Sequence, residues 1–144
     1  MKLGISMRGA NAKAYLEARD ALAHDWYRLM EQALPEVDWV PLPNLGEAVG
    51  DWVSRWALDG VILTGGEDRG TNPLRDATED ALWALCCRGR LRLMGVCRGL
   101  QLLWHWHGGP LCAAPGHVGV RHPIRWTPPW VDAVAKTREV NSFH

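Results

Sequence analysis

A cysteine between two glycines, in residues 95–99 (Gly-Val-Cys-Arg-Gly), has the residue types and spacing of a reactive thiol. A short apolar run precedes it and an amphipathic segment follows, so Cys97 falls at a strand-to-helix turn. In such a turn the glycines keep side chains away, the positive end of the helix favours the thiolate, and the backbone N–H of Arg98 can donate to an oxyanion. The pattern predicts a cysteine nucleophile. The alternative is a buried cysteine in an ordinary turn.

A second candidate segment is residues 64–68 (Thr-Gly-Gly-Glu-Asp), which follows a β-branched apolar run. Paired glycines let a ligand approach the backbone closely, so Gly65 is predicted to line a substrate site. The alternative is a common Gly-Gly turn. The segment is neither a dinucleotide fingerprint nor a phosphate-binding loop, because the spacing G-x-G-x-x-G and a following Gly-Lys-Ser/Thr are both absent.

The elements that must position these residues alternate along the chain. Apolar spacing and turn residues predict strands over 2–7, 37–42, 60–64 and 91–96, helices over 12–34, 45–57, 76–88 and 98–107, and extended segments over 118–126 and 139–143. This alternation favours an α/β fold: a three-layer, doubly wound, mostly parallel sheet in a single domain over 1–144. Ligands of such sheets bind at the carboxyl ends of the strands, where both candidate segments fall.

Composition excludes several classes of function. The 144 residues carry 16 basic and 16 acidic side chains, and a net charge of zero argues against nucleic acid as a partner. The apolar runs are too short for a membrane span, and residues 1–9 lack the apolar stretch of a secretory signal. Four cysteines indicate thiols in a reducing, cytoplasmic compartment. Without a Cys-x-x-Cys pair, no metal is predicted, and no cofactor is expected.

Together, residues 59–68, the Asn-Pro pair at 72–73, residues 95–101 and the late segment 140–144 (Val-Asn-Ser-Phe-His) resemble the class I glutamine amidotransferase family. Within it, the pattern is similar to the gamma-glutamyl hydrolase branch, peptidase family C26. The resemblance covers essentially the whole chain and implies a flavodoxin-like sheet. Residues 15–22 and 116–122 further resemble gamma-glutamyl-CDP-amidate hydrolases, which act in the modification of bacterial surface and capsule polysaccharides.

The resemblance implies a role for each matching residue. Cys97 would attack the γ-carbonyl of a glutamine-like group and form a thioester, and water would then release glutamate. The backbone N–H groups of Gly66 and Arg98 would form the oxyanion hole. Gln101 and His122 would hold the glutamyl part of the substrate.

Two further residues, Arg19 and Asp68, are weaker candidates for binding the other half of the substrate. The alternative reading of both is an ordinary surface or loop ion pair, which we favour for Arg19.

The sequence departs from the family at the catalytic base. The family's histidine lies in a late Trp/Phe-His-Pro-Glu segment, and no His-x-Glu occurs here. His144 matches a motif that precedes that histidine, and His122-Pro123 is followed by Ile124 in place of the acid. We therefore expect a domain that lacks its C-terminal part, with an exposed apolar sheet edge and a tendency to associate; the alternative is a degenerate paralogue.

Two other functions stay open at this point. One is a glutaminase subunit that delivers ammonia to a synthase partner. The other is a non-catalytic γ-glutamyl-binding protein. The expected partners are a small γ-glutamyl substrate and either that synthase or further copies of the chain.

Overall fold

The structure is a computed structural model that describes residues 1–12, 14–126 and 136–142. The chain forms two compact units, residues 1–110 and residues 111–144, and each is described by itself.

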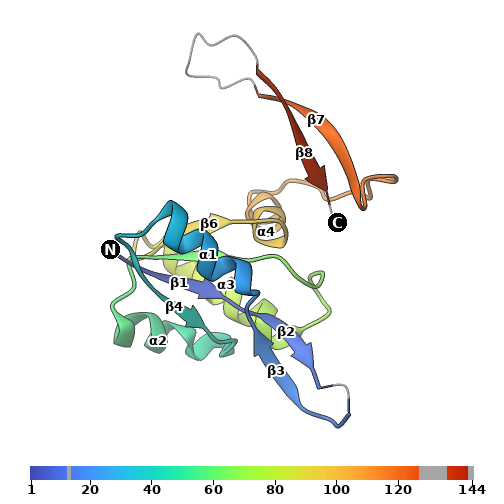
Figure 1. The fold of residues 1–144 in the computed structure, drawn as a ribbon. Coiled ribbons are helices and arrows are strands. Elements are labelled where there is room, and N and C mark those ends of the chain that lie inside the picture. Colours follow the sequence, from blue (N-terminus) through green and yellow to red (C-terminus); the bar gives the residue numbers. More distant parts are fainter. Residues whose placement is uncertain (13, 127–135, 143–144) are drawn as a thin grey trace. The chain divides into compact units, whose positions relative to one another are not determined.

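The first unit is built on a four-stranded parallel sheet (Figure 1). Its strands are β1 (Lys2–Ser6), β4 (Asp38–Leu42), β5 (Gly60–Leu63) and β6 (Arg92–Gly95), in the order β4-β1-β5-β6. Numbered along the chain, this is the order 2-1-3-4, which is flavodoxin-like. The predicted parallel α/β sheet is thus confirmed, and all four predicted strands are present with ends shifted by at most one residue.

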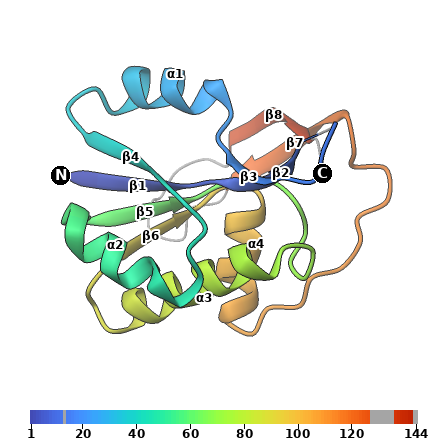
Figure 2. The same ribbon diagram turned by 90° about the horizontal axis from the view of Figure 1, so that it is seen from below.

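Helices cover both faces of this sheet, as the three-layer prediction requires (Figure 2). Helix α1 (His24–Ala33) packs on one face, where Met30 contacts a buried cluster with Ile5 and Ile62. The other face carries a short 3-10 turn, η1 (Gly46–Ala48), and the helices α2 (Val49–Trp56), α3 (Pro73–Cys87) and α4 (Arg98–Trp106). Buried side chains of α2 and α3 form the larger core cluster there with β4 and β5.

The predicted helix over 12–34 is wrong in its first half. Residues 8–21 form an antiparallel hairpin of β2 (Arg8–Asn11) and β3 (Ala18–Ala21), and the helix begins only at His24. The apolar spacing was misleading at Leu22. This residue packs, like Trp26, against the buried cluster that contains Met30, although it precedes the helix. Leu16, by contrast, is fully exposed at the hairpin tip, so no apolar face extends through the first half.

Helix α3 begins three residues before the predicted start at 76. Its N-cap is Asn72, whose side chain accepts a hydrogen bond from the backbone N–H of Arg75 at 3.2 Å, and Pro73 is the first helical residue. Both residue types are common at these positions, because asparagine satisfies an unpaired N–H and proline has no N–H to lose. The earlier start adds one turn to the helix next to the candidate site.

The second unit contains an antiparallel pair, β7 (Val120–Trp126) and β8 (Lys136–Ser142). Its register places Val120 opposite Ser142, and the backbone N–H of Gly119 donates to the carbonyl of Ser142 at 2.8 Å. The extended segments predicted over 118–126 and 139–143 are confirmed over residues 120–126 and 139–142 of the described chain, whereas residues 118–119 form a turn. Residues 127–135 and 143 lie outside the described residues.

Candidate active site

Cys97 occupies a strained turn between β6 and α4. It has φ 54° and ψ −113°, and Ala57 is the other non-glycine residue with positive φ in the described chain. Such a conformation persists only where the surroundings enforce it. The glycines on either side of Cys97 show how closely the surroundings enclose this turn, because neither position has room for a side chain. A methyl group added at Gly95 would lie 2.3 Å from the carbonyl carbon of Gly99, and one added at Gly99 would lie 2.3 Å from the carbonyl oxygen of Leu63.

The end of β5 lies directly beside this turn. A methyl group added at Gly65 would lie 3.3 Å from Sγ of Cys97, so the thiol faces Gly65 across a space that leaves little room for a side chain. The preceding residue is fixed from β1, because the backbone N–H of Thr64 donates to Oγ of Ser6 at 3.0 Å and its hydroxyl donates to the Ser6 carbonyl at 2.9 Å. Gly66 follows with φ 140°. The structure therefore brings the two predicted segments together.

A buried cluster of five charged side chains joins both segments to α3. Glu79 is fully buried and accepts from Nε of Arg75 at 3.0 Å and from Nη1 of Arg98. Arg75, also fully buried, donates to Glu67 at 2.9 Å, and Arg98 donates to Asp76. Sequence reasoning missed this cluster. The available signal was the i,i+4 spacing of Arg75 and Glu79, which is equally typical of an exposed helix pair.

Arg75 also fixes the peptide groups of the glycine segment. Its Nη2 donates to the carbonyl oxygens of Thr64 at 3.0 Å and of Gly65 at 3.1 Å. In a trans peptide the N–H points opposite to the C=O. Hence the backbone N–H groups of Gly65 and Gly66 point away from Arg75. The orientation of these two peptide groups is thus held by a buried guanidinium and not left to a flexible glycine pair.

Glu67 ties the hairpin to the same cluster. Its Oε1 accepts from the backbone N–H of Gly9 at 3.0 Å. Burial raises the pKa of the Glu67 carboxyl, but hydrogen bonds from its own N–H and that of Gly9, together with the Arg75 charge, outweigh this and lower the pKa below its ordinary value of 4.5. Glu67 is therefore an anion at neutral pH and serves as an anchor for the segment that contains Gly66.

The remaining predicted residues fall in different places. The backbone N–H of Gln101 donates to the carbonyl of Cys97 at 3.0 Å, which puts Gln101 one turn along α4. Arg98 is the first residue of that helix, where the backbone N–H has no intrahelical acceptor. His122 lies in β7 of the second unit, opposite Val140, with its ring 4.7 Å from that of His117. Its role in substrate binding stays a prediction.

The two weaker candidates lie on the surface of the first unit. Arg19 pairs with Glu17 and with the hydroxyl of Tyr15 near the hairpin tip, and about half of its side chain is exposed. This favours the surface ion pair as the reading of Arg19. Asp68 is exposed in the loop after β5, where its carbonyl accepts from the backbone N–H of Thr71 at 3.1 Å.

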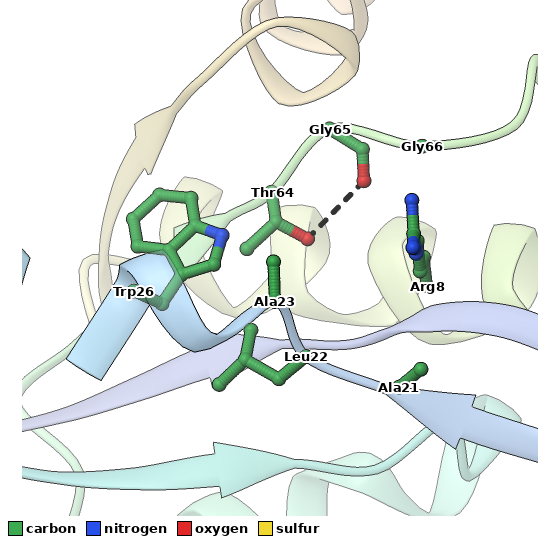
Figure 3. A pocket seen from close by; sticks show the side chains of 8 residues that line it. All are labelled: Arg8, Ala21, Leu22, Ala23, Trp26, Thr64, Gly65 and Gly66. Atoms are coloured by element: carbon green, nitrogen blue, oxygen red, sulfur yellow. Dashed lines mark hydrogen bonds between the residues drawn. The ribbon is translucent and has the colours of Figure 1, made fainter. Parts of the chain in front are cut away.

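A cavity of about 230 Å³ opens next to the glycine segment (Figure 3). It is lined by Arg8, the 21–23 segment, Trp26 and residues 64–66. It lies between the carboxyl ends of β1 and β5. The chain crosses from one side of the sheet to the other there, because β1 leads to β4 on one side and β4 leads back to β5 on the other. Such a switch point is where open α/β sheets bind ligands.

Residues 1–12, 14–126 and 136–142 contain no group of three or more histidine, cysteine, aspartate or glutamate side chains placed to hold a metal ion. No helix in this part of the chain is long and apolar enough to cross a membrane. None of the four cysteines, all of them in this part, forms a disulfide.

These features define an α/β protein with a cysteine site at the carboxyl edge of its parallel sheet, where the strained cysteine turn adjoins the Gly-Gly strand end. The chain belongs to the Peptidase C26 family, because a sequence profile of that family matches residues 3–144. It is 29% identical over 130 residues to the gamma-glutamyl-CDP-amidate hydrolase of Campylobacter jejuni subsp. jejuni serotype O:2 (strain ATCC 700819 / NCTC 11168). The alignment covers 86% of this chain and 64% of that relative. The family predicted from residues 59–68 and 95–101 is confirmed.

Proposed function

We propose that this protein is a cysteine-nucleophile hydrolase of γ-glutamyl amide-type bonds. The observation that carries the proposal is the position of Cys97, held at φ 54° with its sulfur facing Gly65, where an added methyl group would lie 3.3 Å from Sγ. A thiol at the start of a helix, beside backbone N–H groups of fixed orientation, suits attack on a carbonyl followed by stabilisation of the oxyanion.

The reaction proceeds in two halves. The sulfur of Cys97 forms a bond to the γ-carbonyl carbon, the C–N bond breaks, and the nitrogen leaves with a proton. Water then attacks the thioester carbon, the C–S bond breaks, and glutamate leaves as the thiol regains its proton. In both halves the carbonyl oxygen becomes an oxyanion, to which the backbone N–H groups of Gly66 and Arg98 donate.

The glutamyl part lies along the start of α4. Gln101 is one turn beyond Cys97, so its amide can bind the amino-acid end of the substrate, and Gly65 lets the substrate chain approach the β5 end closely. The family resemblance assigns His122 to binding of the glutamyl part as well, and we keep that role as part of the proposal. We assign the proton transfers to a His-x-Glu pair, as the family resemblance implies. We propose that the whole gene product supplies this pair from outside these 144 residues.

The proposed substrate follows from the relative. A protein called gamma-glutamyl-CDP-amidate hydrolase acts on a γ-glutamyl group joined through nitrogen to a nucleoside diphosphate. We propose the same class of substrate here, with release of glutamate and the amidate, as a step in surface polysaccharide modification in the cytoplasm.

The testing experiment is the intact mass of the native gene product before and after treatment with a glutamine-mimicking chloroketone. We expect a single adduct, mapped by peptide analysis to Cys97 and absent in Cys97→Ser. Cys112→Ser is the matched control, because Cys112 is an exposed cysteine of the second unit and its loss should leave the adduct in place. An adduct that persists in Cys97→Ser, or no adduct at all, would contradict the proposal.

A further inference from the structure

We infer that Arg8 binds a phosphoryl group in the leaving half of the substrate, an inference that rests on the proposed function. Nothing in the family resemblance assigned a role to this residue. Arg8 follows β1 by two positions and lines the cavity beside the Gly-Gly segment. Figure 3 shows its side chain on the Gly66 side of the cavity, away from Trp26.

The position of Arg8 relative to the thiol follows from two close approaches. A methyl group added at Gly66 would lie 2.9 Å from Cβ of Arg8, and one added at Gly65 would lie 3.3 Å from Sγ of Cys97. Four groups therefore lie in a row at the end of β5: the Cys97 thiol, Gly65, Gly66 and Arg8. A substrate carbonyl held between Cys97 and the N–H of Gly66 would direct one of its substituents toward Arg8.

Arg8 differs from the other two arginines at this edge of the sheet. Arg75 and Arg98 are buried and each is paired with two carboxylates. Arg8 is exposed, and no carboxylate within residues 1–12 and 14–110 forms an ion pair with it. The cavity thus presents one uncompensated cation beside two glycines whose backbone is open to a ligand.

The chemistry of this cation fits a phosphoryl group. A guanidinium presents a planar fork of donors that matches the oxygens of phosphate. The cavity of about 230 Å³ is below the usual range of 300–1,000 Å³ for a whole small-molecule ligand, so it suits one group of a larger substrate. The glutamyl part would lie on the other side of the thiol, toward Gln101.

The positive charge of Arg8 also indicates which type of leaving group the site suits. When the C–N bond breaks, the departing nitrogen of an amidate stays bonded to phosphorus, whose oxygens carry negative charge before and after the step. Arg8 would neutralise that charge but would not supply the proton, because a guanidinium does not deprotonate in proteins. Ammonia, which a glutaminase releases, carries no anion for Arg8 to bind. The residue therefore favours an amidate hydrolase over a glutaminase subunit.

The first test compares two substrates on the whole gene product: γ-glutamyl phosphoramidate, with an anionic leaving half, and glutamine, with a neutral one. We expect Arg8→Gln to lower kcat/KM for the phosphoramidate about tenfold to a hundredfold and to change kcat/KM for glutamine less than about twofold. Arg8→Lys should restore part of the loss. Arg55→Gln is the matched control, because Arg55 is an exposed arginine near the end of α2, at the opposite edge of the sheet. Equal losses on both substrates, or none, would overturn the inference.

The second test needs no turnover and separates this inference from the proposed function. The rate at which iodoacetamide alkylates Cys97 is measured with and without cytidine diphosphate. Protection in the wild type and in Arg55→Gln, but not in Arg8→Gln, supports the inference even where both substrates are inert. Protection that survives in Arg8→Gln, or that is absent from the wild type, overturns it. Failure of the proposed function has a different signature: Cys97 remains unmodified by the chloroketone.

Discussion

Replacing Glu79 by glutamine tests whether the buried charge cluster holds the cysteine turn in place. Glu79→Gln preserves shape but removes the anion that accepts from Arg75 and Arg98 at once. Removing one partner of a buried ion pair costs about 3–5 kcal/mol, because a buried charge loses its compensation. Here Arg75 keeps Glu67 and Arg98 keeps Asp76, so we expect the low end of that range, about 3 kcal/mol.

The assay is equilibrium unfolding in urea followed by tryptophan fluorescence. With a slope of about 2 kcal/mol/M, a loss of about 3 kcal/mol lowers the midpoint by about 1.5 M. The matched control is Glu31→Gln, the same change at an exposed position of α1. A midpoint for Glu79→Gln that equals that of Glu31→Gln would refute the reasoning, since it would mean that the buried anion contributes nothing to stability.

The same variant has a second readout at the site itself. If the cluster positions the turn, then Glu79→Gln changes the rate of Cys97 alkylation under conditions where the protein is still folded. Glu31→Gln leaves that rate unchanged. An unchanged rate in a destabilised Glu79→Gln would show that the cluster stabilises the fold without positioning the thiol.

Three further predictions concern the sheet edge. Gly99→Ala places a methyl group 2.3 Å from the Leu63 carbonyl oxygen and should lower the free energy of unfolding by about 1–3 kcal/mol or more. Gly50→Ala is the control, because it has open space around it and should change the free energy of unfolding by less than about 1 kcal/mol. Urea unfolding distinguishes the two variants. Because the folded pKa of Glu67 lies below 4.5, its stabilisation is present above that pH and is lost as pH falls through the folded value. Stability measured between about pH 6 and pH 3 should therefore fall less steeply in Glu67→Gln than in the wild type. Met94 is 60% exposed on β6, which ends the described sheet, so Met94→Lys should reduce self-association of the 144-residue chain in sedimentation velocity.

Much of the fold was predictable because its signals are local. The β-branched run at 60–63 and the helical spacing in α4 fix their own elements, and the glycines around Cys97 predict a tight turn. Family membership followed from the same segments. The hairpin over 8–21 was not predictable from periodicity, because Leu22 contributes to the core from outside the helix that its spacing suggested.

The charge cluster could not be predicted for a different reason. Burial of Arg75 depends on β5 ending against α3, a tertiary fact that the i,i+4 spacing to Glu79 does not contain. The role inferred for Arg8 could not be predicted for the same reason. It depends on the closeness of Arg8 to Gly66, and that closeness exists because β1 and β5 are neighbours in the sheet.

Arg98 shows how the fold and the candidate site depend on one another. Its backbone N–H opens α4 next to Cys97, while its side chain turns inward to Glu79 and Asp76. The residue that offers the proposed oxyanion donor is thereby anchored to the helix that also orients, through Arg75, the peptide of Gly66. Both proposed donors are held by one buried cluster, so their spacing is set by α3. Rigid spacing of this kind is what stabilisation of an oxyanion requires, because donors that need no reorganisation contribute most in the transition state.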